Sequence, residues 1–210
     1  MPGRLIALEG IDGSGKTTQA RLLAARLDPS VVTLTAEPGG TALGAALRRL
    51  LLDPERGPMT GRAEALLLAA DRAQHVAEVV APALAVGRWV VTDRFSGSTL
   101  AYQGYGRDLG LEGLRGLVRF AAEGIEADVN VLVDVPVAVA QDRRGRGPGD
   151  RFEQAGERFQ EVVRAGYQAL AEAEPTRWVV VDGTGEVEDV AAALLAAVNE
   201  RVGPLPTVGG

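Results

Sequence analysis

The segment Gly10–Thr17 constrains the fold of this chain more than any other part of its sequence. It reads Gly-Ile-Asp-Gly-Ser-Gly-Lys-Thr and satisfies the pattern G-x-x-x-x-G-K-[ST]. An apolar run over residues 4–9 predicts a buried strand before it, and residues 16–27 have the apolar periodicity of a helix. Glycines let backbone N–H groups turn inward around an anion, and a helix N-terminus adds partial positive charge. The segment therefore predicts a strand–loop–helix unit that binds phosphates.

Lys16 is the only lysine of the chain, and every other basic residue of the Lys and Arg set is an arginine. A lysine at this place in the pattern puts a point charge on the β- and γ-phosphates of a nucleotide, and the hydroxyl of Thr17 can bind Mg²⁺. The composition also excludes one class of nucleotide-binding protein. A GTPase switch usually recognises guanine through an Asn-Lys-x-Asp element, and this chain has no second lysine to form one.

Apolar segments of strand length alternate with helical periodicity along the chain. This alternation predicts an α/β fold with an open parallel five-stranded sheet, helices on both faces and a small lid. The expected strands are residues 4–9, 31–35, 89–92, 129–135 and 177–181. The expected helices are residues 16–27, 43–52, 62–86, 111–124, 136 onward, 153–173 and 187–201, and residues 102–110 are expected to form a loop.

Length and composition indicate a single globular domain. The 210 residues show no repeat, low-complexity tract or linker, so we expect one domain over residues 1–202, a lid near residues 143–152 and a flexible tail over residues 203–210. The net charge of −6 argues against bulk binding to nucleic acid or an anionic membrane. No apolar run reaches the roughly 18 residues needed to cross a bilayer. The absence of cysteine excludes disulfides, thiol catalysis and cysteine-bound zinc.

Two further segments carry charge suited to phosphoryl transfer. Asp93 and Arg94 follow the third expected strand, and the carboxyl ends of parallel strands line the ligand crevice of an open sheet. There the acid would support Mg²⁺ and the arginine would bridge two phosphates; a surface ion pair is the alternative. A glycine-broken segment contains Arg143, Arg144, Arg146 and Arg151. This segment either closes as a lid that stabilises the transferred charge or forms a solvated basic loop.

Several other side chains are candidates for binding the acceptor. Asp12 lies inside the phosphate-binding segment, where a carboxylate repels phosphates, and this cost suggests a hydroxyl or magnesium partner. Arg72 lies on a long expected helix and can hydrogen-bond a base or a phosphate. Tyr102 and Gln103 combine an aromatic ring with an amide, which can stack on a base and read its edge. His75 is the only histidine, and we assign it no catalytic role.

Taken together, these residues resemble the thymidylate kinase family over most of the chain. The motifs that carry the resemblance are Leu8–Gln19, Glu37–Thr41, Asp71-Arg72, Asp93–Phe95 with Ser98–Gly104, and Asp150–Glu153. The family has two designs, one with a catalytic arginine in the phosphate-binding loop and one with it in the lid. Gly13 follows Asp12 here and the lid segment is rich in arginine, so the chain resembles the bacterial, lid-arginine type.

The resemblance implies a P-loop NTPase-type fold and phosphorylation of dTMP to dTDP by ATP with Mg²⁺, for dTTP synthesis. It implies a cytoplasmic homodimer that pairs through helices and whose partners are ATP and dTMP, with no nucleic acid and no membrane. The implied ATP-binding residues are Gly10, Ile11, Asp12, Gly13, Ser14, Gly15, Lys16, Thr17, Thr18 and Arg143. The implied substrate-binding residues are Asp12, Glu37, Pro38, Arg48, Leu68, Arg72, Arg94, Ser98, Thr99, Tyr102 and Gln103. The implied metal ligands are Thr17, Asp93 and Glu37, and the implied catalytic residues are Lys16, Arg94, Arg144, Arg146 and Arg151.

Two positions depart from the family pattern. Ala36 stands where the family commonly has arginine, and Leu68 stands where it often has a phenylalanine that stacks on thymine. Loss of an aromatic face removes about 0.5–1.5 kcal/mol of stacking. The alternatives are a deoxynucleoside kinase, another P-loop nucleoside-monophosphate kinase, or a non-catalytic nucleotide-binding switch. Arg48, Arg72 and Arg94 favour an acceptor that already carries a phosphate.

Overall fold

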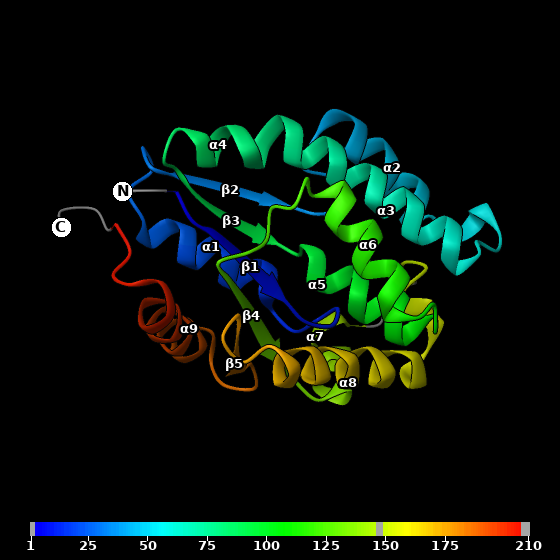
Figure 1. The fold of residues 1–210 in the computed structure, drawn as a ribbon. Helices are drawn as coiled ribbons and strands as arrows, with labels where there is room; N and C mark the ends of the chain where they lie inside the picture. The colour runs from blue at the N-terminus through cyan, green and yellow to red at the C-terminus, as the bar shows by residue number, and fades with distance from the viewer. Residues whose placement is uncertain (1–2, 146–148, 207–210) are drawn as a thin grey trace.

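Five parallel strands form one open sheet in the part of the chain that the structure, a computed structural model, describes (residues 3–145 and 149–206). The strands are β1 (Leu5–Glu9), β2 (Val32–Ala36), β3 (Trp89–Asp93), β4 (Val129–Asp134) and β5 (Trp178–Asp182), in the order β2-β3-β1-β4-β5 (Figure 1). All neighbouring pairs run parallel. The predicted open, parallel five-stranded sheet is confirmed.

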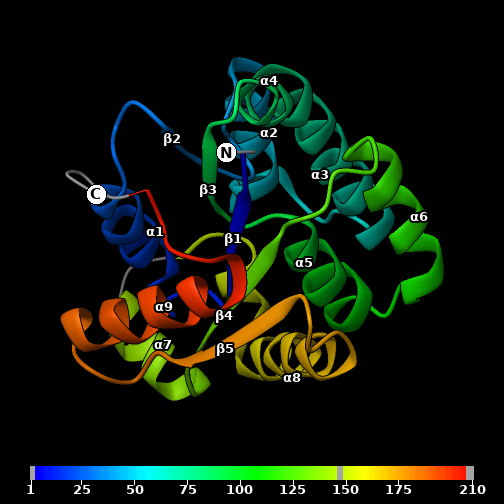
Figure 2. The same cartoon turned by 60° about the vertical axis from the view of Figure 1, so that its left-hand side comes forward.

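Helices cover both faces of the sheet. The α-helices are α1 (Lys16–Arg26), α2 (Ala42–Leu52), α3 (Gly61–His75), α4 (Ala81–Ala85), α5 (Ser96–Thr99), α6 (Leu111–Ala121), α7 (Val137–Arg144), α8 (Glu157–Ala173) and α9 (Val187–Val202). The shorter elements are η1 (Pro54–Arg56), η2 (Val76–Val80), η3 (Leu100–Gly106) and η4 (Glu153–Ala155). Figure 2 shows α1 and α9 on one face, with α4, α5, α6 and α8 on the other.

The central strand β1 is buried along its whole length because β3 and β4 pair with its two edges. Its side chains alternate between the two faces of the sheet. Ile6 packs with Leu23 of α1 and Leu194 of α9, whereas Leu5 packs with Val80 of η2. Burial on both faces explains the continuous apolar run that the sequence shows here. The carboxyl ends of β1, β3 and β4 therefore meet at one edge of the sheet, next to the Gly10–Thr17 loop.

The expected loop over residues 102–110 is wrong for residues 102–106, whereas residues 107–110 lie outside the helices and strands as expected. Residues Leu100–Gly106 form the π-helical turn η3, which continues α5 without a break. Its glycines lower helix propensity, so the local sequence does not predict a helix. Tertiary packing compensates, because Gly106 lies so close to α8 that a Cβ there would come within 2.7 Å of Phe159. The expected helix over residues 153–173 is also divided, since Gly156 has a φ of 91° and α8 begins only at Glu157.

The segment expected to be a flexible tail begins with packed residues. Leu205 is buried, its N–H donates to Asn199 Oδ1, and the carbonyl of Pro206 accepts from the N–H of Asp28. Residues 207–210 lie outside the described residues. Within residues 3–145 and 149–206, none of the helices has the length and apolar character that a bilayer crossing requires.

Candidate active site

The Gly10–Thr17 loop joins β1 to α1 as the motif predicts. Gly13 and Gly15 have φ values of 87° and 93°, a region that residues with a side chain rarely adopt. Lys16 is buried; its Nζ donates to the carbonyl of Ile11 at 3.1 Å and lies 3.7 Å from Asp12 Oδ1. Burial and the nearby charge of Arg94 lower the pKa of Lys16. The loop thus holds its ammonium group against the backbone of the turn and beside the Asp12 carboxylate.

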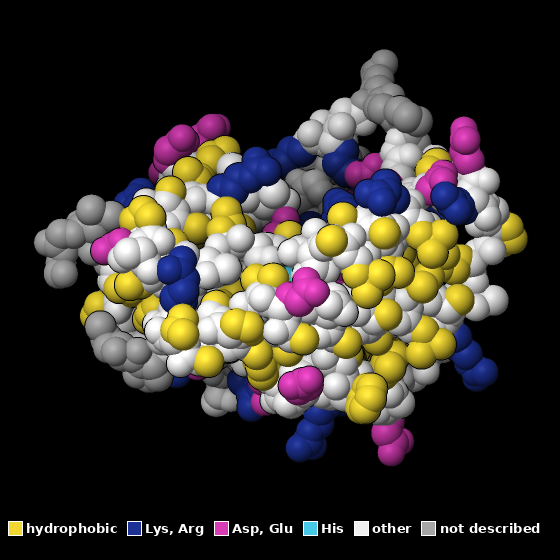
Figure 3. Space-filling view, turned by 90° about the horizontal axis from the view of Figure 1, so that it is seen from above, with side chains coloured by type: hydrophobic (Ala, Val, Ile, Leu, Met, Phe, Trp, Pro, Cys, Tyr) yellow, Lys and Arg dark blue, Asp and Glu magenta, His cyan; other side chains and the backbone are white. Residues whose placement is uncertain are grey.

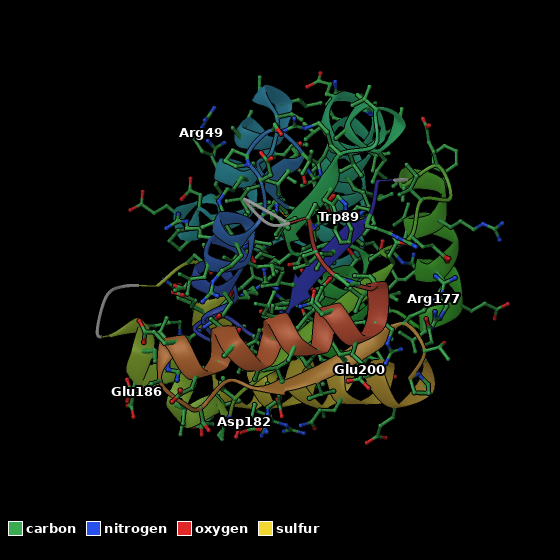
Figure 4. The ribbon with its side chains drawn as sticks, turned by 90° about the vertical axis from the view of Figure 1, so that its left-hand side faces the viewer. Arg49, Trp89, Arg177, Asp182, Glu186 and Glu200 are labelled. Carbon is green, nitrogen blue, oxygen red and sulfur yellow. The ribbon has the colours of Figure 1, made fainter. Side chains whose placement is uncertain are left out.

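A cavity lies over this loop and extends to the segment that follows β5. Its lining residues are Gly13, Ser14, Gly15, Lys16, Thr17, Thr18, Gln19, Arg143, Gly183, Thr184, Gly185, Glu186, Val187 and Val190. Arg143 bridges its two sides, because its guanidinium donates to the carbonyls of Ser14 and Thr184, each at 3.4 Å. Figure 4 shows Asp182 and Glu186 at the end of β5 opposite to Arg177, so the segment lies at the carboxyl edge of the sheet.

A second cavity lies on the other side of Asp12. It is lined by Asp12, Glu37, Pro38, Arg48, Leu52, Leu68, Arg72, Arg94, Phe95, Ser98, Thr99, Tyr102, Gln103, Asp150 and Phe152. Every residue expected to bind the acceptor is in this set, which joins the ends of β2 and β3, helices α2 and α3, and η3. The sequence analysis missed Leu52, Phe95, Asp150 and Phe152 as lining residues.

Arg94 lines this cavity and has a left-handed backbone conformation, with a φ of 73°. One guanidinium nitrogen, Nη2, donates to Asp12 Oδ1 at 2.6 Å, and the other, Nη1, donates to Ser98 Oγ at 2.9 Å and to Tyr167 OH at 3.1 Å. Burial disfavours ionisation of Asp12, but the charges of Arg94 and Lys16 outweigh it and hold the pKa of Asp12 below its ordinary value. Arg94 and Asp12 therefore form an ion pair in the second cavity, next to Gly13, which lines the first.

Glu9 supports this ion pair from below. Its Oε1 accepts the N–H of Phe95 at 3.0 Å, and its Oε2 accepts the hydroxyls of Ser98 at 2.6 Å and Tyr167 at 3.1 Å. Burial raises the pKa of Glu9. Neither Glu9 nor Tyr167 has a role that could be predicted from the sequence. Glu9 was visible only as a charged residue that ends a buried strand, and Tyr167 lies 158 residues away from it.

Arg72 forms the deep wall of the second cavity and is buried. Its Nε donates to Glu37 Oε2 at 2.9 Å, its Nη1 to Thr99 Oγ1 at 3.0 Å, and its Nη2 to the carbonyl of Phe95 at 2.9 Å. The other oxygen of Glu37 lies 2.8 Å from Nδ1 of the buried His75. His75 thus orients Glu37 from behind.

Thr17, which lines the first cavity, forms a pair of oxygen ligands with Asp93. The hydroxyl of Thr17 donates to Asp93 Oδ2, and Asp93 Oδ1 is buried without a hydrogen-bond partner among the described residues. Mg²⁺ prefers oxygen ligands, so a hydroxyl and a carboxylate oxygen that lacks a hydrogen bond suit this ion. The structure does not bring Glu37 into this pair, because both of its oxygens face Arg72 and His75. Glu37 is therefore not supported as a metal ligand.

The arginines of the expected lid occupy different places. Arg144 lies against the loop, where its Cγ would be 3.0 Å from a Cβ on Gly13. Its buried Nη1 has no hydrogen-bond partner among the described residues, and it lies 4.0 Å from Glu153 Oε1. Arg151 instead donates through Nη1 to Glu64 at 2.7 Å and through Nε to the carbonyl of Leu51 at 2.8 Å. These contacts give Arg151 a structural role, and they do not support the catalytic role expected from the sequence. Arg146 lies outside the described residues.

Comparison with known proteins agrees with this geometry. The thymidylate kinase family model matches residues 8–194. The chain is 47% identical over 207 residues to a thymidylate kinase of Synechococcus sp. (strain CC9311), covering 95% of this chain and 97% of the relative. It belongs to the thymidylate kinase family. A second relative, the thymidylate kinase of Desulforudis audaxviator, is also 47% identical over 213 residues, covering 100% of this chain and 96% of the relative.

A solved thymidylate kinase from Ehrlichia chaffeensis has the same fold as this family member. The two superpose with a TM-score of 0.78 at 30% identity, covering 95% of this chain and 99% of the other. Membership in the thymidylate kinase family also gives meaning to Gly13. A Cβ at this position would collide with the carbonyl of Ala140 in α7, so the loop has no room for an arginine here. The positive charge must come from elsewhere, and Arg144 is the lid arginine nearest to that position among the described residues.

Proposed function

We propose that the chain transfers the γ-phosphoryl group of ATP to dTMP and yields dTDP and ADP. The observation that carries this proposal is that one stretch of the loop forms a wall of each cavity, because Gly13 lines the first and its neighbour Asp12 lines the second. The phosphate-binding loop lines one cavity with Lys16 and Thr17, and the same loop sends Asp12 into the other, where it pairs with Arg94. A donor phosphate and an acceptor phosphate on either side of this stretch would lie close enough to react.

The binding of ATP follows from the first cavity. Backbone N–H groups of the loop and the N-terminus of α1 would bind the phosphates, with Lys16 on the β- and γ-phosphates. Thr17 and Asp93 would hold Mg²⁺, which when bound neutralises charge on the phosphate oxygens. The segment Thr184–Val187 and Arg143 would enclose the adenosine end, since they form the rest of the cavity wall. The sequence analysis missed this segment, although its glycines after the last strand mark a turn at the carboxyl edge.

The binding of dTMP follows from the second cavity. Arg94 would bind the acceptor phosphate together with Arg48, whose Nη1 donates to the carbonyl of Pro38 at 2.9 Å. Asp12 would accept from the sugar 3′-hydroxyl. Ser98, Thr99, Tyr102 and Gln103 would surround the sugar and base with Glu37, Leu68 and Arg72. Leu68 offers an apolar face in place of an aromatic one, so we expect weaker stacking.

The reaction is an in-line displacement. An oxygen of the dTMP phosphate attacks the γ-phosphorus, and the bond from that phosphorus to the bridging oxygen breaks, leaving ADP. Negative charge spreads over the transferred oxygens, so the chain needs fixed positive groups around them. Lys16 Nζ and Arg94 Nη2 lie 3.7 Å and 2.6 Å from the same atom, Asp12 Oδ1, and Arg144 lies against Gly13. Arg144 would add a third positive group to this pair.

An ADP-release assay with dTMP, dUMP, dCMP, AMP and thymidine tests this function. We expect dTMP to give the highest kcat/KM, dUMP a lower one and thymidine a lower one still. Faster turnover of thymidine than of dTMP would replace the proposal by a deoxynucleoside kinase. A chain that hydrolyses ATP at the same rate with every acceptor would contradict it altogether.

We also propose a cytoplasmic homodimer that serves dTTP synthesis. Leu43 on α2 and Leu66 on α3 are large apolar residues with about half of their surface exposed, at 49% and 59%. Figure 3 shows apolar side chains gathered on the face over which α3 and α4 run. A second copy would cover such a surface. Analytical ultracentrifugation of the wild type and of Leu66→Glu tests the dimer. We expect the wild type to sediment with the mass of a dimer and the variant with that of a monomer. A wild type that sediments as a monomer, like the variant, would contradict the proposal.

A further inference from the structure

Glu64 in the first turn of α3 is a buried acid for which neither the motifs nor the proposed chemistry accounts. Its side chain is fully shielded from solvent, with an exposed fraction of 0%. Oε1 accepts from Gln103 Nε2 at 2.6 Å and from Arg107 Nε at 3.3 Å. Oε2 accepts from Arg107 Nη2 at 3.2 Å and from Arg151 Nη1 at 2.7 Å. The carboxylate of Glu64 thus binds Gln103, Arg107 and Arg151, and Arg151 lies at the end of the expected lid.

The carboxylate fixes which way round the amide of Gln103 lies. A carboxylate can only accept hydrogen bonds, so the donor Nε2 of Gln103 must face Glu64 and the acceptor Oε1 must face away. Gln103 is itself fully buried and lines the acceptor cavity. Its Oε1 has no hydrogen-bond partner within residues 3–145 and 149–206. A buried acceptor without a donor is costly, so it points to a donor that the ligand supplies.

The chemistry of the pyrimidines makes this orientation selective. Thymine and uracil carry a donor at N3 and an acceptor at C4, whereas cytosine carries an acceptor at N3 and a donor at C4. An amide whose oxygen is free to accept matches the N3–H donor of thymine and uracil and opposes the N3 acceptor of cytosine. If the amide could turn over, Gln103 would accept either base. Selection therefore depends on the residue that prevents the turn.

We infer that Glu64 is a positioning residue that fixes the amide polarity of Gln103 and couples base selection to the lid end. This inference rests on the proposed function and adds a specificity-determining residue to it. The coupling runs through Arg151, whose guanidinium stacks on Phe152 at 4.8 Å. Phe152 and Asp150 line the same cavity as Gln103. Glu64 thus binds both Gln103, which would contact the base, and Arg151, which lies at the end of the lid that lines the same cavity.

The variant Glu64→Gln tests the inference because it keeps the shape and can offer an N–H. The new amide can donate to Gln103 Oε1 and so let Gln103 turn over. We expect the ratio of kcat/KM for dTMP to that for dCMP to fall by at least about tenfold, the factor that corresponds to roughly 1.4 kcal/mol. The conservative variant Glu64→Asp keeps an acceptor-only group, and we expect it to retain the ratio even if total activity falls.

Arg107→Ala is the matched control. Arg107 binds the same carboxylate, but it is absent from the lining of the acceptor cavity and is not part of the lid. We expect this variant to lose some thermal stability and to keep the dTMP to dCMP ratio. An unchanged ratio in Glu64→Gln, with a lower melting temperature alone, would overturn the inference and leave Glu64 a purely structural residue. If Glu64→Gln does not fold, Glu64→Asp carries the test, and a collapsed ratio in that variant would overturn the inference.

A second readout needs no catalysis. Amide hydrogen exchange at residues 150–155 should accelerate in Glu64→Gln and in Arg151→Ala but not in Arg107→Ala, because Glu64→Gln makes the acceptor of Arg151 neutral and Arg151→Ala removes the donor, whereas Arg107→Ala leaves this contact intact. Calorimetric binding of dTMP and dCMP gives the base preference without turnover. A wild-type chain that binds dTMP over dCMP but releases no ADP would refute the proposed function and leave this inference standing. Equal exchange in all three variants would overturn the coupling to the lid.

Discussion

Replacing Arg94 by methionine should separate the two halves of the active site. The change keeps the length of the side chain but leaves the Asp12 carboxylate without its 2.6 Å partner. Breaking one partner of a buried ion pair costs about 3–5 kcal/mol. The side chains of Arg94 and Asp12 are 14% and 23% exposed, so solvent screening places the cost near the lower end of that range. A loss of about 3 kcal/mol corresponds to a fall of roughly 6–12 °C in Tm for a chain of this size.

Activity should respond more strongly than stability. Arg94 is expected to bind the acceptor phosphate, and removal of one preorganised charge at a transition state costs about 10²–10³ in kcat. We therefore expect kcat/KM for dTMP to fall by that factor while the KM for ATP changes by less than about threefold, because Arg94 does not line the ATP cavity. Steady-state kinetics with each substrate varied in turn, together with thermal melts, would measure both effects.

Arg158→Met provides a matched control, since Arg158 is exposed on α8 and lines neither cavity. It should retain the kinetics and Tm of the wild type. The reasoning would be refuted if Arg94→Met kept the dTMP kinetics of the wild type. An equal rise in the KM values of both substrates would also refute it, because it would show that Arg94 does not distinguish acceptor from donor.

Three further predictions follow from individual contacts. Lys16→Ala should abolish transfer while leaving Tm nearly unchanged; wild-type turnover in the coupled assay would rule out its role. Gly13→Ala should lower both Tm and ATP affinity, because a Cβ meets the Ala140 carbonyl and φ is 87°; unchanged calorimetric binding would contradict this. Burial and the charge of Glu37 raise the pKa of Asp71 from 3.8 to about 6. The folded state thus holds this proton more tightly, so wild-type stability relative to Asp71→Asn should fall as pH rises from 4 to 6 and then level off; a flat or rising difference in urea unfolding would show the opposite sign.

The sheet and the two cavities could be predicted because local patterns determine them. Apolar runs mark strands that are buried on both faces, and the carboxyl ends of parallel strands converge whatever the rest of the chain does. Asp12, Arg94 and Tyr102 follow or flank such ends, so their meeting in one cavity follows from topology. The element η3 was missed because its glycines disfavour a helix, and it is packing against α6 and α8 that supports it.

The supporting residues could not be predicted in the same way, since their partners are distant in sequence. Glu64 lies 39 residues from Gln103 and 87 from Arg151, and no local pattern marks those contacts. The lid arginines show the same limit. Arg144 and Arg151 are close in sequence and identical in chemistry, yet one faces the phosphate-binding loop and the other faces Glu64. Their roles depend on which residues each side chain contacts in the folded chain.

The most direct test of the central claim is ³¹P NMR of the wild-type chain with ATP, Mg²⁺ and dTMP. The account predicts that the γ-phosphorus signal of ATP declines while the two signals of dTDP grow in equal amount, with no accumulation of inorganic phosphate. Growth of inorganic phosphate in place of dTDP would show that water, and not the dTMP phosphate, reaches the γ-phosphorus. That result would contradict a donor and an acceptor held on either side of Asp12 and Arg94.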